Sequence, residues 1–251
     1  MCFDFDARPP LPPVRGGAAD HGELVLTSAD GTRFQAAYAH PDAPSARGAA
    51  TGIVILPDIR GLHPFYAELA QRVAEAGLHA VAIDYFGRTA GVGMRSDGFE
   101  FRPHVDQLQP ARVTEDVGAA VEWLRSLGNG TVSSVFTLGF CMGGAHSWRQ
   151  SAAGFGLAGC IGFYGRPDRV EDVIPTMEAP LLLLAAGQDR TPVETVEAFA
   201  QQVRDAGVEA EMHVYPDAPH SFFDRRFAEH REACDDAWKR ILAFVERHAT
   251  R

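Results

Sequence analysis

The chain has 251 residues, of which 46% are hydrophobic and 22% are charged, so it suits one large folded domain rather than a disordered segment. Its formal net charge of −10 argues against nucleic acids and acidic membranes as partners, because neither attracts an acidic protein. A local basic pocket is still able to bind a small anion.

Residues 1–20 are expected to form an extended arm, and residues 21–251 a single domain. The arm is rich in proline and lacks the apolar core of a signal peptide, and no run in the chain reaches the length of a membrane span. The chain has four cysteines, Cys2, Cys141, Cys160 and Cys234. They lack the spacing of metal or disulfide motifs, which indicates reduced thiols and a cytoplasmic protein.

The predicted strands begin with a hairpin. Two alternating segments, residues 23–28 and 32–40, flank Asp30-Gly31, which is a strong turn signal. Continuous apolar runs follow at residues 52–56, 80–83, 135–138, 158–163 and 181–185. Strands without alternation are typical of a parallel sheet that is buried on both faces. The last run, residues 211–215, alternates more and is expected toward an edge of the sheet.

Helical periods lie between these runs, around residues 65–73, 113–124, 193–203 and 238–245. Strands that alternate with helices predict βαβ units and helices on both faces of the sheet. Thr191-Pro192-Val193-Glu194 fits a capping box with proline in the first helical position. Residues 87–110 have no clear period, and a solvated loop is favoured there over a substrate lid.

Residues Gly139-Phe140-Cys141-Met142-Gly143-Gly144 form the most informative motif. An apolar strand precedes this G-x-C-x-G-G turn and a helix start of small residues follows it, which is the context of a nucleophile elbow. Free cysteines are usually buried small hydrophobes, but the glycine frame favours a nucleophilic thiol at Cys141. The other three cysteines lack such a frame and are expected to be structural or inert.

Acidic and basic side chains follow the other predicted strands. Ligands bind beyond the carboxyl ends of parallel strands, where Asp58, Asp84, Cys141, Asp189 and His220 are expected. The order nucleophile, acid, histidine is the order of α/β-hydrolases. The sequence therefore predicts an α/β-hydrolase fold, with a mostly parallel central sheet, an N-terminal antiparallel hairpin and helices on both faces.

In that fold His220 is predicted to be the base that takes the thiol proton, and Asp189 to orient its imidazole. The alternatives are a surface-loop histidine and an acid that merely suits the start of a helix. The oxyanion requires two backbone donors, which are predicted to be the N–H groups of Met142 and Ile59.

Three motifs together resemble the dienelactone hydrolase family, also called carboxymethylenebutenolidases. They are residues 139–144, Gly187-Gln188-Asp189 and His220-Ser221-Phe222, and the resemblance extends over residues 52–248. It implies an α/β-hydrolase core without a large cap, and a triad of Cys141, Asp189 and His220. The type reaction opens an unsaturated, carboxylate-bearing lactone with water and needs neither a cofactor nor a metal.

The resemblance also implies further site residues. In the family an acid on the first-strand loop holds the resting thiol, then swings and takes its proton when substrate binds. Asp58 stands at that position, where the type member has glutamate. Arg88 matches one of two arginines that bind the substrate carboxylate; the alternative is a surface cation. The second arginine is expected where this chain has Asp224, so Arg225 or Arg226 is the candidate replacement.

The resulting hypothesis is a hydrolase of small esters or lactones that forms an acyl-enzyme on Cys141, acting as a monomer or a homodimer. The alternative keeps the fold and makes Cys141 a redox sensor, with Cys160 as a possible partner, or makes the pocket a ligand-binding module. A dinucleotide-dependent oxidoreductase is disfavoured, because no G-x-G-x-x-G motif follows the first parallel strand.

Overall fold

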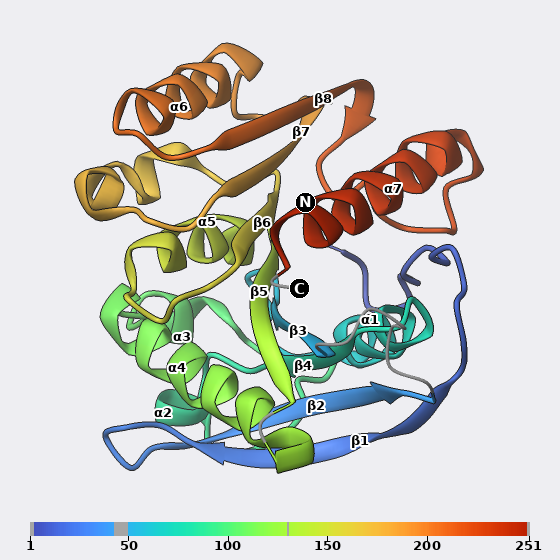
Figure 1. Ribbon diagram of the computed structural model, residues 1–251. Coiled ribbons are helices and arrows are strands. Elements are labelled where there is room, and N and C mark those ends of the chain that lie inside the picture. The colour runs from blue at the N-terminus through green and yellow to red at the C-terminus, as the bar shows by residue number, and fades with distance from the viewer. Residues whose placement is uncertain (1–2, 43–49, 130, 250–251) are drawn as a thin grey trace.

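One sheet of eight strands organises the molecule, in the order β1-β2-β4-β3-β5-β6-β7-β8 (Figure 1). The computed structural model describes residues 3–42, 50–129 and 131–249. The strands are β1 (Ala18–Thr27), β2 (Arg33–Pro41), β3 (Ala50–Leu56), β4 (His79–Ile83), β5 (Val132–Phe140), β6 (Gly159–Phe163), β7 (Leu181–Gln188) and β8 (Ala210–Pro219). β1 runs antiparallel to β2, β2 runs antiparallel to β4, and strands β3 to β8 run parallel to one another.

The hairpin between β1 and β2 forms where Asp30-Gly31 predicts it. Gly31 adopts a φ of 82°, which favours glycine, and the Asp30 carboxylate accepts the N–H of Thr32 at 2.9 Å. The residue 211–215 segment lies in β8, at the edge of the sheet, as its alternation indicates.

Helices cover both faces of the sheet (Figure 1). α1 (Pro64–Glu75) and α7 (Arg231–His248) lie on one face, and α4 (Pro110–Ser126), α5 (Met142–Arg149) and α6 (Val193–Asp205) lie on the other. The faces predicted for α1, α4, α6 and α7 are largely buried, for example Phe65, Leu69 and Val73 in α1, while Val193 of α6 and Leu242 of α7 are half-buried. The predicted fold class is confirmed. No described helix combines the length and the apolar composition that crossing a membrane requires.

The predicted capping box at the start of α6 is wrong. The helix begins at Val193, so Pro192 occupies the N-cap position with an extended ψ of 142°, and no side chain caps the helix. A proline at the N-cap has no side-chain oxygen to offer to the first free amides, so Thr191 and Glu194 do not form the reciprocal pair.

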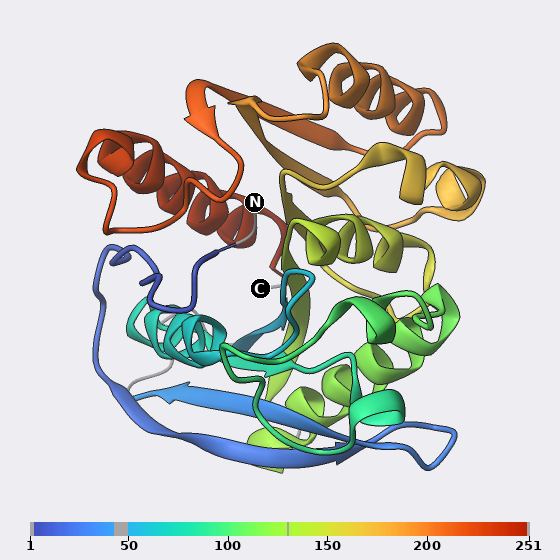
Figure 2. The ribbon, with the colours of Figure 1, turned by 180° about the vertical axis from the view of Figure 1, so that it is seen from behind.

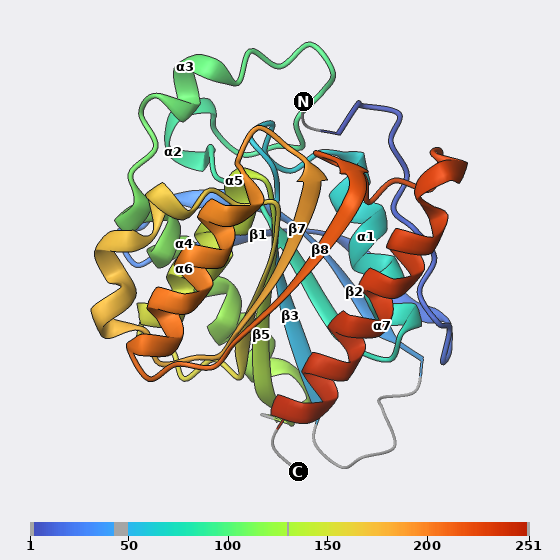
Figure 3. The ribbon, with the colours of Figure 1, turned by 90° about the horizontal axis from the view of Figure 1, so that it is seen from above.

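The segment after β4 is held against the sheet. It contains two short helices, α2 (Gly87–Ala90) and α3 (Arg102–Val105). Between them Arg95 is buried, and its guanidinium donates to both oxygens of Asp84, at 3.1 and 2.6 Å, and to the carbonyl of Gly91 at 2.6 Å. Figure 3 shows this segment and the N-terminal arm at the end of the sheet to which β7 and β8 point.

The N-terminal arm passes between α1 and α7 (Figure 2). Phe3 is 2% exposed and stacks on Phe65 at a centroid distance of 4.0 Å, and the Trp238 indole donates to the Pro10 carbonyl at 3.1 Å. β1 begins at Ala18, so the strand includes the last residues of the predicted 1–20 arm. Cys2 lies outside the described residues.

Replacing Phe3 by alanine is expected to lower the free energy of unfolding by about 3 kcal/mol, because the ring fills a site in the main core. Chemical denaturation monitored by circular dichroism measures the change. Leu11→Ala in the same arm is the matched control, since Leu11 is 53% exposed and its loss should change the value by less than about 0.5 kcal/mol. Equal effects of the two substitutions would contradict a structural role for the arm.

Candidate active site

Cys141 forms a one-residue turn between β5 and α5. Its φ of 56° and ψ of −116° are rare for a residue with a side chain and cost about 1–3 kcal/mol. Its N–H donates to the Phe163 carbonyl at the end of β6 at 3.1 Å, and its own carbonyl accepts the N–H of Gly144 at 3.0 Å. This is the strained strand-to-helix turn of a nucleophile elbow.

The glycines around Cys141 allow the first turn of α5 to press against the neighbouring strand ends. A Cβ at Gly143 would lie 2.2 Å from the carbonyl oxygens of both Leu56 and Pro57. A Cβ at Gly139 would lie 1.9 Å from the Gly143 carbonyl oxygen, and one at Gly144 would lie 2.4 Å from a β6 carbonyl oxygen. These contacts are with backbone, which cannot swing aside, so larger residues are excluded at each position.

Asp189 and His220 form a hydrogen-bonded pair at the same end of the sheet. Asp189 directly follows β7, His220 directly follows β8, and the pairing of Gln188 with Pro219 brings them together. The imidazole Nδ1 donates to Asp189 Oδ2 at 2.8 Å, and the two side chains are 19% and 8% exposed. This hydrogen bond fixes the orientation of the ring, with Nδ1 toward Asp189.

The pKa of Asp189 reflects two opposing effects. Partial burial, the largest effect, raises it, but the hydrogen bond and the charge of His220, together with the Arg190 N–H, lower it below its ordinary value. Asp189 therefore stays ionised and holds the ring in one orientation.

Tyr164 is a residue of this site that the sequence analysis missed. It follows β6 directly, it is 3% exposed, and its ring lies 4.6 Å from the His220 ring and 6.3 Å from that of Phe140, the residue before Cys141. Among the described non-glycine residues, Cys141, Tyr164 and Ser221 are those with a positive φ. Such strain gathers at functional sites. The strand-end rule, extended to the residue 158–163 run, would have found Tyr164.

Most amides of the loop after β3 donate hydrogen bonds to described residues. In residues 58–62, the Asp58 N–H donates to the Tyr66 hydroxyl, and the N–H groups of Arg60 and Gly61 donate to oxygens of Asp58. The Leu62 N–H donates to Asp84. Within this turn, the Ile59 N–H is the amide that donates no hydrogen bond to a described residue. It is the amide that the oxyanion prediction names, and that role stays a prediction.

Asp58 is fully buried beside a histidine that the sequence analysis did not single out. Its Oδ1 accepts the Arg60 N–H at 2.8 Å, and its Oδ2 lies 3.7 Å from Nε2 of His63. Asp58 is 0% and His63 is 1% exposed. Among the described residues, neither Oδ2 nor either ring nitrogen of His63 has a hydrogen-bond partner. No signal in the sequence indicates that His63 lies beside Asp58, because the fold of the loop brings the two side chains together.

Tyr85 connects this loop electrostatically to the nucleophile. Its hydroxyl donates to the Pro57 carbonyl at 2.8 Å. Complete burial, followed by the charges of Asp58, Asp84 and Cys141, raises the pKa of Tyr85 well above its ordinary value. The acid of the first-strand loop and the thiol therefore act on the same buried hydroxyl, which remains protonated.

The arginines suggested by the resemblance are engaged elsewhere. The Arg88 guanidinium donates to Asp30 at 3.0 Å and to Asp116, which is 1% exposed, at 2.6 Å. Arg225 donates to Glu68 at 2.9 Å. These carboxylates offset the charges of both arginines, and the structure does not bring either guanidinium together with the Asp189–His220 pair.

Asp224 anchors the N-terminal arm. This residue is 0% exposed, and it accepts the N–H of Arg8 at 3.1 Å and the Nε–H of Arg226 at 2.8 Å. Arg226 also pairs with Asp6 of the arm. The position where the family resemblance places an arginine thus holds the arm in place, and Arg226 is engaged by the same contacts.

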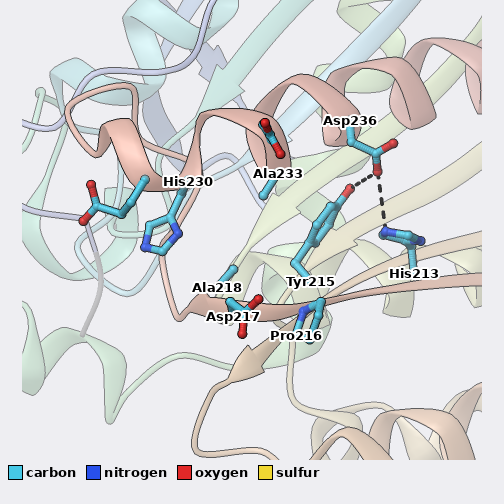
Figure 4. Close-up of a pocket in the computed structure, with 10 residues that line it drawn as sticks. His213, Tyr215, Pro216, Asp217, Ala218, His230, Ala233 and Asp236 are labelled. Carbon is cyan, nitrogen blue, oxygen red and sulfur yellow. Dashed lines mark hydrogen bonds and ion pairs between the residues drawn. The ribbon is translucent and has the colours of Figure 1, made fainter.

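One hollow of the structure is not lined by Cys141. It has a volume of about 290 Å³ and lies between the end of β8 and the start of α7 (Figure 4). There Asp236 accepts the Tyr215 hydroxyl at 3.0 Å and lies 3.5 Å from His213. Over the described ranges, no group of three or more His, Cys, Asp or Glu side chains is placed to hold a metal ion.

Cys160 and Cys234 are buried thiols, and burial raises the pKa of each to about 12. Cys160 of β6 lies opposite Thr137 of β5. Thr137 is four residues before Cys141, and four residues of a strand span about 13 Å. A disulfide requires Cα atoms within about 7 Å, so Cys160 cannot pair with Cys141 in this fold.

The sheet order, the elbow after β5 and the acid–histidine pair after β7 and β8 define an α/β-hydrolase. The chain belongs to the dienelactone hydrolase family, whose model matches residues 34–249. This confirms the resemblance and makes the chain an ester or lactone hydrolase.

Individual relatives agree with this assignment. A Salmonella typhi protein, provisionally named a carboxymethylenebutenolidase, is 29% identical over 244 residues, which span 92% of this chain and 89% of that protein. A Bradyrhizobium protein, provisionally named a 2-oxo-3-(5-oxofuran-2-ylidene)propanoate lactonase, is 24% identical over 87% of this chain and 92% of its own. A crystal structure from Klebsiella pneumoniae subsp. pneumoniae MGH 78578, provisionally named a dienelactone hydrolase, has a TM-score of 0.76 at 26% identity and covers 90% of this chain and 99% of that one.

Replacing Gly143 by alanine is expected to destabilise the protein by about 3 kcal/mol, because the new methyl group meets two backbone carbonyls. Esterase activity should fall as well, because the elbow has to widen to accommodate the methyl group. Gly98→Ala is the matched control: its Cβ would point into open space, so the change should stay within about 0.5 kcal/mol. Denaturation curves of both variants measure the difference. If Gly143→Ala left the free energy of unfolding unchanged, the close packing at Gly143 would be disproved.

Asp189→Asn is expected to lower the free energy of unfolding by about 1 kcal/mol at neutral pH. Because the folded-state pKa of Asp189 lies below its unfolded value, the carboxylate stabilises the fold above about pH 4 and loses that effect as the pH falls toward the folded pKa. The difference between the variant and the natural chain should therefore shrink on acidification. Urea melts at several pH values measure it, and a difference that grows below pH 4 would contradict the assignment.

Proposed function

We propose that the chain hydrolyses small esters and lactones through an acyl-enzyme on Cys141, with Asp189 and His220 completing a catalytic triad. The observation that carries this proposal is the strained elbow of Cys141 at the sheet end that also holds the hydrogen-bonded acid–histidine pair. A thiol in a left-handed turn framed by glycines has no packing advantage over a simpler turn, so its strain is best explained by catalysis.

In the first step the Cys141 thiolate attacks the carbonyl carbon and a C–S bond forms. The oxyanion accepts the N–H groups of Met142 and Ile59, which are already in place when the charge develops. The tetrahedral adduct then collapses, the ester C–O bond breaks, and the leaving oxygen takes up the proton that the Cys141 thiol had given up. In a lactone the leaving oxygen stays attached through the ring.

In the second step water hydrolyses the thioester. His220 takes a proton from water through Nε2 while Asp189 holds Nδ1, the C–O bond forms, and the C–S bond breaks to release the thiolate, to which the proton on Nε2 then returns. The ionised state of Asp189 supports this role, because it stabilises the imidazolium that forms.

Asp58 is the proposed acceptor of the resting thiol proton. Its Oδ2 has no hydrogen-bond partner among the described residues, so a lone pair is available, and its charge acts on the same Tyr85 hydroxyl as Cys141. Aspartate has one methylene less than the family's glutamate, so the carboxylate must act from a more fixed position.

The proposed substrate class is a small lactone that carries a carboxylate, as in the name of the Bradyrhizobium relative. A thiol nucleophile requires a reducing compartment, so we place the reaction in the cytoplasm, in a monomer or a homodimer. The redox-sensor alternative is weaker, because Cys160 is too far along its strand to form a disulfide with Cys141, and burial raises the pKa of both Cys160 and Cys234 to about 12.

Cys141→Ala is expected to reduce kcat for a cis-dienelactone and for a neutral aryl ester by about 10³-fold or more, because both steps pass through the thiol. Circular dichroism of the variant controls for folding. Mass spectrometry of His220→Ala mixed with an activated ester should show acyl mass on the tryptic peptide of Cys141. Full activity of Cys141→Ala would reject the mechanism.

A further inference from the structure

A small cavity lies between the N-terminal arm, the loop after β3 and the segment after β4. Its volume is about 60 Å³, the space of about two water molecules or one carboxylate group. Phe5, Phe99 and Phe101 form its apolar walls, and Arg60 and His63 contribute its polar groups. Loops from three parts of the chain meet here, at the end of the sheet that carries the nucleophile (Figure 3).

Arg60 differs from the other arginines near the site. Its guanidinium has no hydrogen bond or ion pair with any described residue, although the side chain is partly buried. Arg95, which also lines the cavity, is neutralised by both oxygens of Asp84. Arg88 and Arg225 are paired with carboxylates in the same way. Arg60 therefore carries the cavity's uncompensated positive charge.

His63 provides an independent observation that a ligand belongs here. It lines the same cavity at 1% exposure, and neither ring nitrogen has a hydrogen-bond partner among the described residues. Buried polar atoms are almost always satisfied, so unpaired ones at a cavity wall indicate a polar group that is bound there. The acids nearby are Asp58, 3.7 Å from His63, and Asp97, which lines the cavity from an exposed position and is screened by solvent.

We propose that this cavity binds the carboxylate of the substrate, through an ion pair with Arg60 and a hydrogen bond from His63. The inference rests on the proposed function and assigns its carboxylate to residues other than Arg88 and Arg225. Arg60 directly follows Ile59, the proposed oxyanion donor, so the cation and the oxyanion site are neighbours on one tight turn. A substrate that reaches both has its carboxylate only a few bonds from the reacting carbonyl, and the phenylalanine walls favour a planar, unsaturated linker.

A matched pair of esters tests the proposal. Mono(4-nitrophenyl) fumarate and 4-nitrophenyl crotonate share a planar unsaturated acyl chain, and they differ by a carboxylate in place of a methyl group. Arg60→Gln is expected to lower kcat/KM for the fumarate ester about 10- to 100-fold, mainly through KM, because one charged hydrogen bond is lost. The value for the crotonate ester should stay within about twofold. Arg60→Lys should retain part of the preference, since it keeps the charge without the planar fork.

Two control variants distinguish the effect of Arg60 from a general effect of positive charge and from a role of Arg88, the arginine that the family resemblance suggests. Arg102→Gln removes an exposed cation from the same segment and should leave the ratio of the two esters unchanged. Arg88→Gln should also leave the ratio unchanged. Equal losses on both esters in Arg60→Gln, or a selective loss in Arg88→Gln instead, would overturn the proposal.

A binding measurement keeps the proposal separate from the mechanism. Calorimetry of Cys141→Ala with monomethyl fumarate should show binding that weakens about 10-fold or more when Arg60→Gln is added. His63→Asn should weaken it as well, with thermal melts as the folding control. If Arg60→Gln left the affinity for monomethyl fumarate unchanged, the carboxylate site would be rejected even where Cys141 proves catalytic. An active Cys141→Ala would reject the acyl-enzyme and leave the binding result standing.

Discussion

The close approach of the first turn of α5 to the end of β3 is the contact on which the site depends. It exists because Gly143 has no side chain, so that the helix start presses against the carbonyls of Leu56 and Pro57. Cys141, with its positive φ, lies two residues before this contact, and Asp58 directly follows Pro57. The proposed nucleophile and the proposed first-strand acid thus lie on either side of one backbone contact, and any larger residue at Gly143 would push the two segments apart.

Charge is distributed at this end of the sheet so that most cations are already neutralised. Asp84 binds Arg95 and also the amides of Leu62 and Phe86, so one buried carboxylate fixes two loops. Asp224 and Arg226 similarly anchor the arm. Removing one partner of a buried pair leaves an uncompensated charge, which typically costs about 3–5 kcal/mol. These arginines are therefore structural, and selectivity for an anion falls to a cation that the fold has left unpaired.

The arm contributes to the site as well as to stability. Phe3 packs against Phe65 and Phe140, which precedes the nucleophile, and Phe5 lies beside His63. Aromatic rings exclude water from the buried Asp58–His63 pair, and in such surroundings each charge interacts more strongly than in solvent. The arm therefore helps to cover the loop after β3 at His63.

The sequence by itself determined the sheet, the helical faces, the elbow and the order of Cys141, Asp189 and His220. These follow from local signals, namely apolar runs, 3.6-residue periods and glycines around one cysteine, which act over a few residues. The partners of each charge were decided by the tertiary structure. Arg88 faces Asp116, which lies 28 residues away, and Arg226 faces Asp6 across 220 residues. The same holds for Tyr164 beside His220 and for His63 beside Asp58, whose proximity arises from strand order and loop folding. No local pattern encodes which carboxylate an arginine meets, because that pairing depends on how distant segments pack.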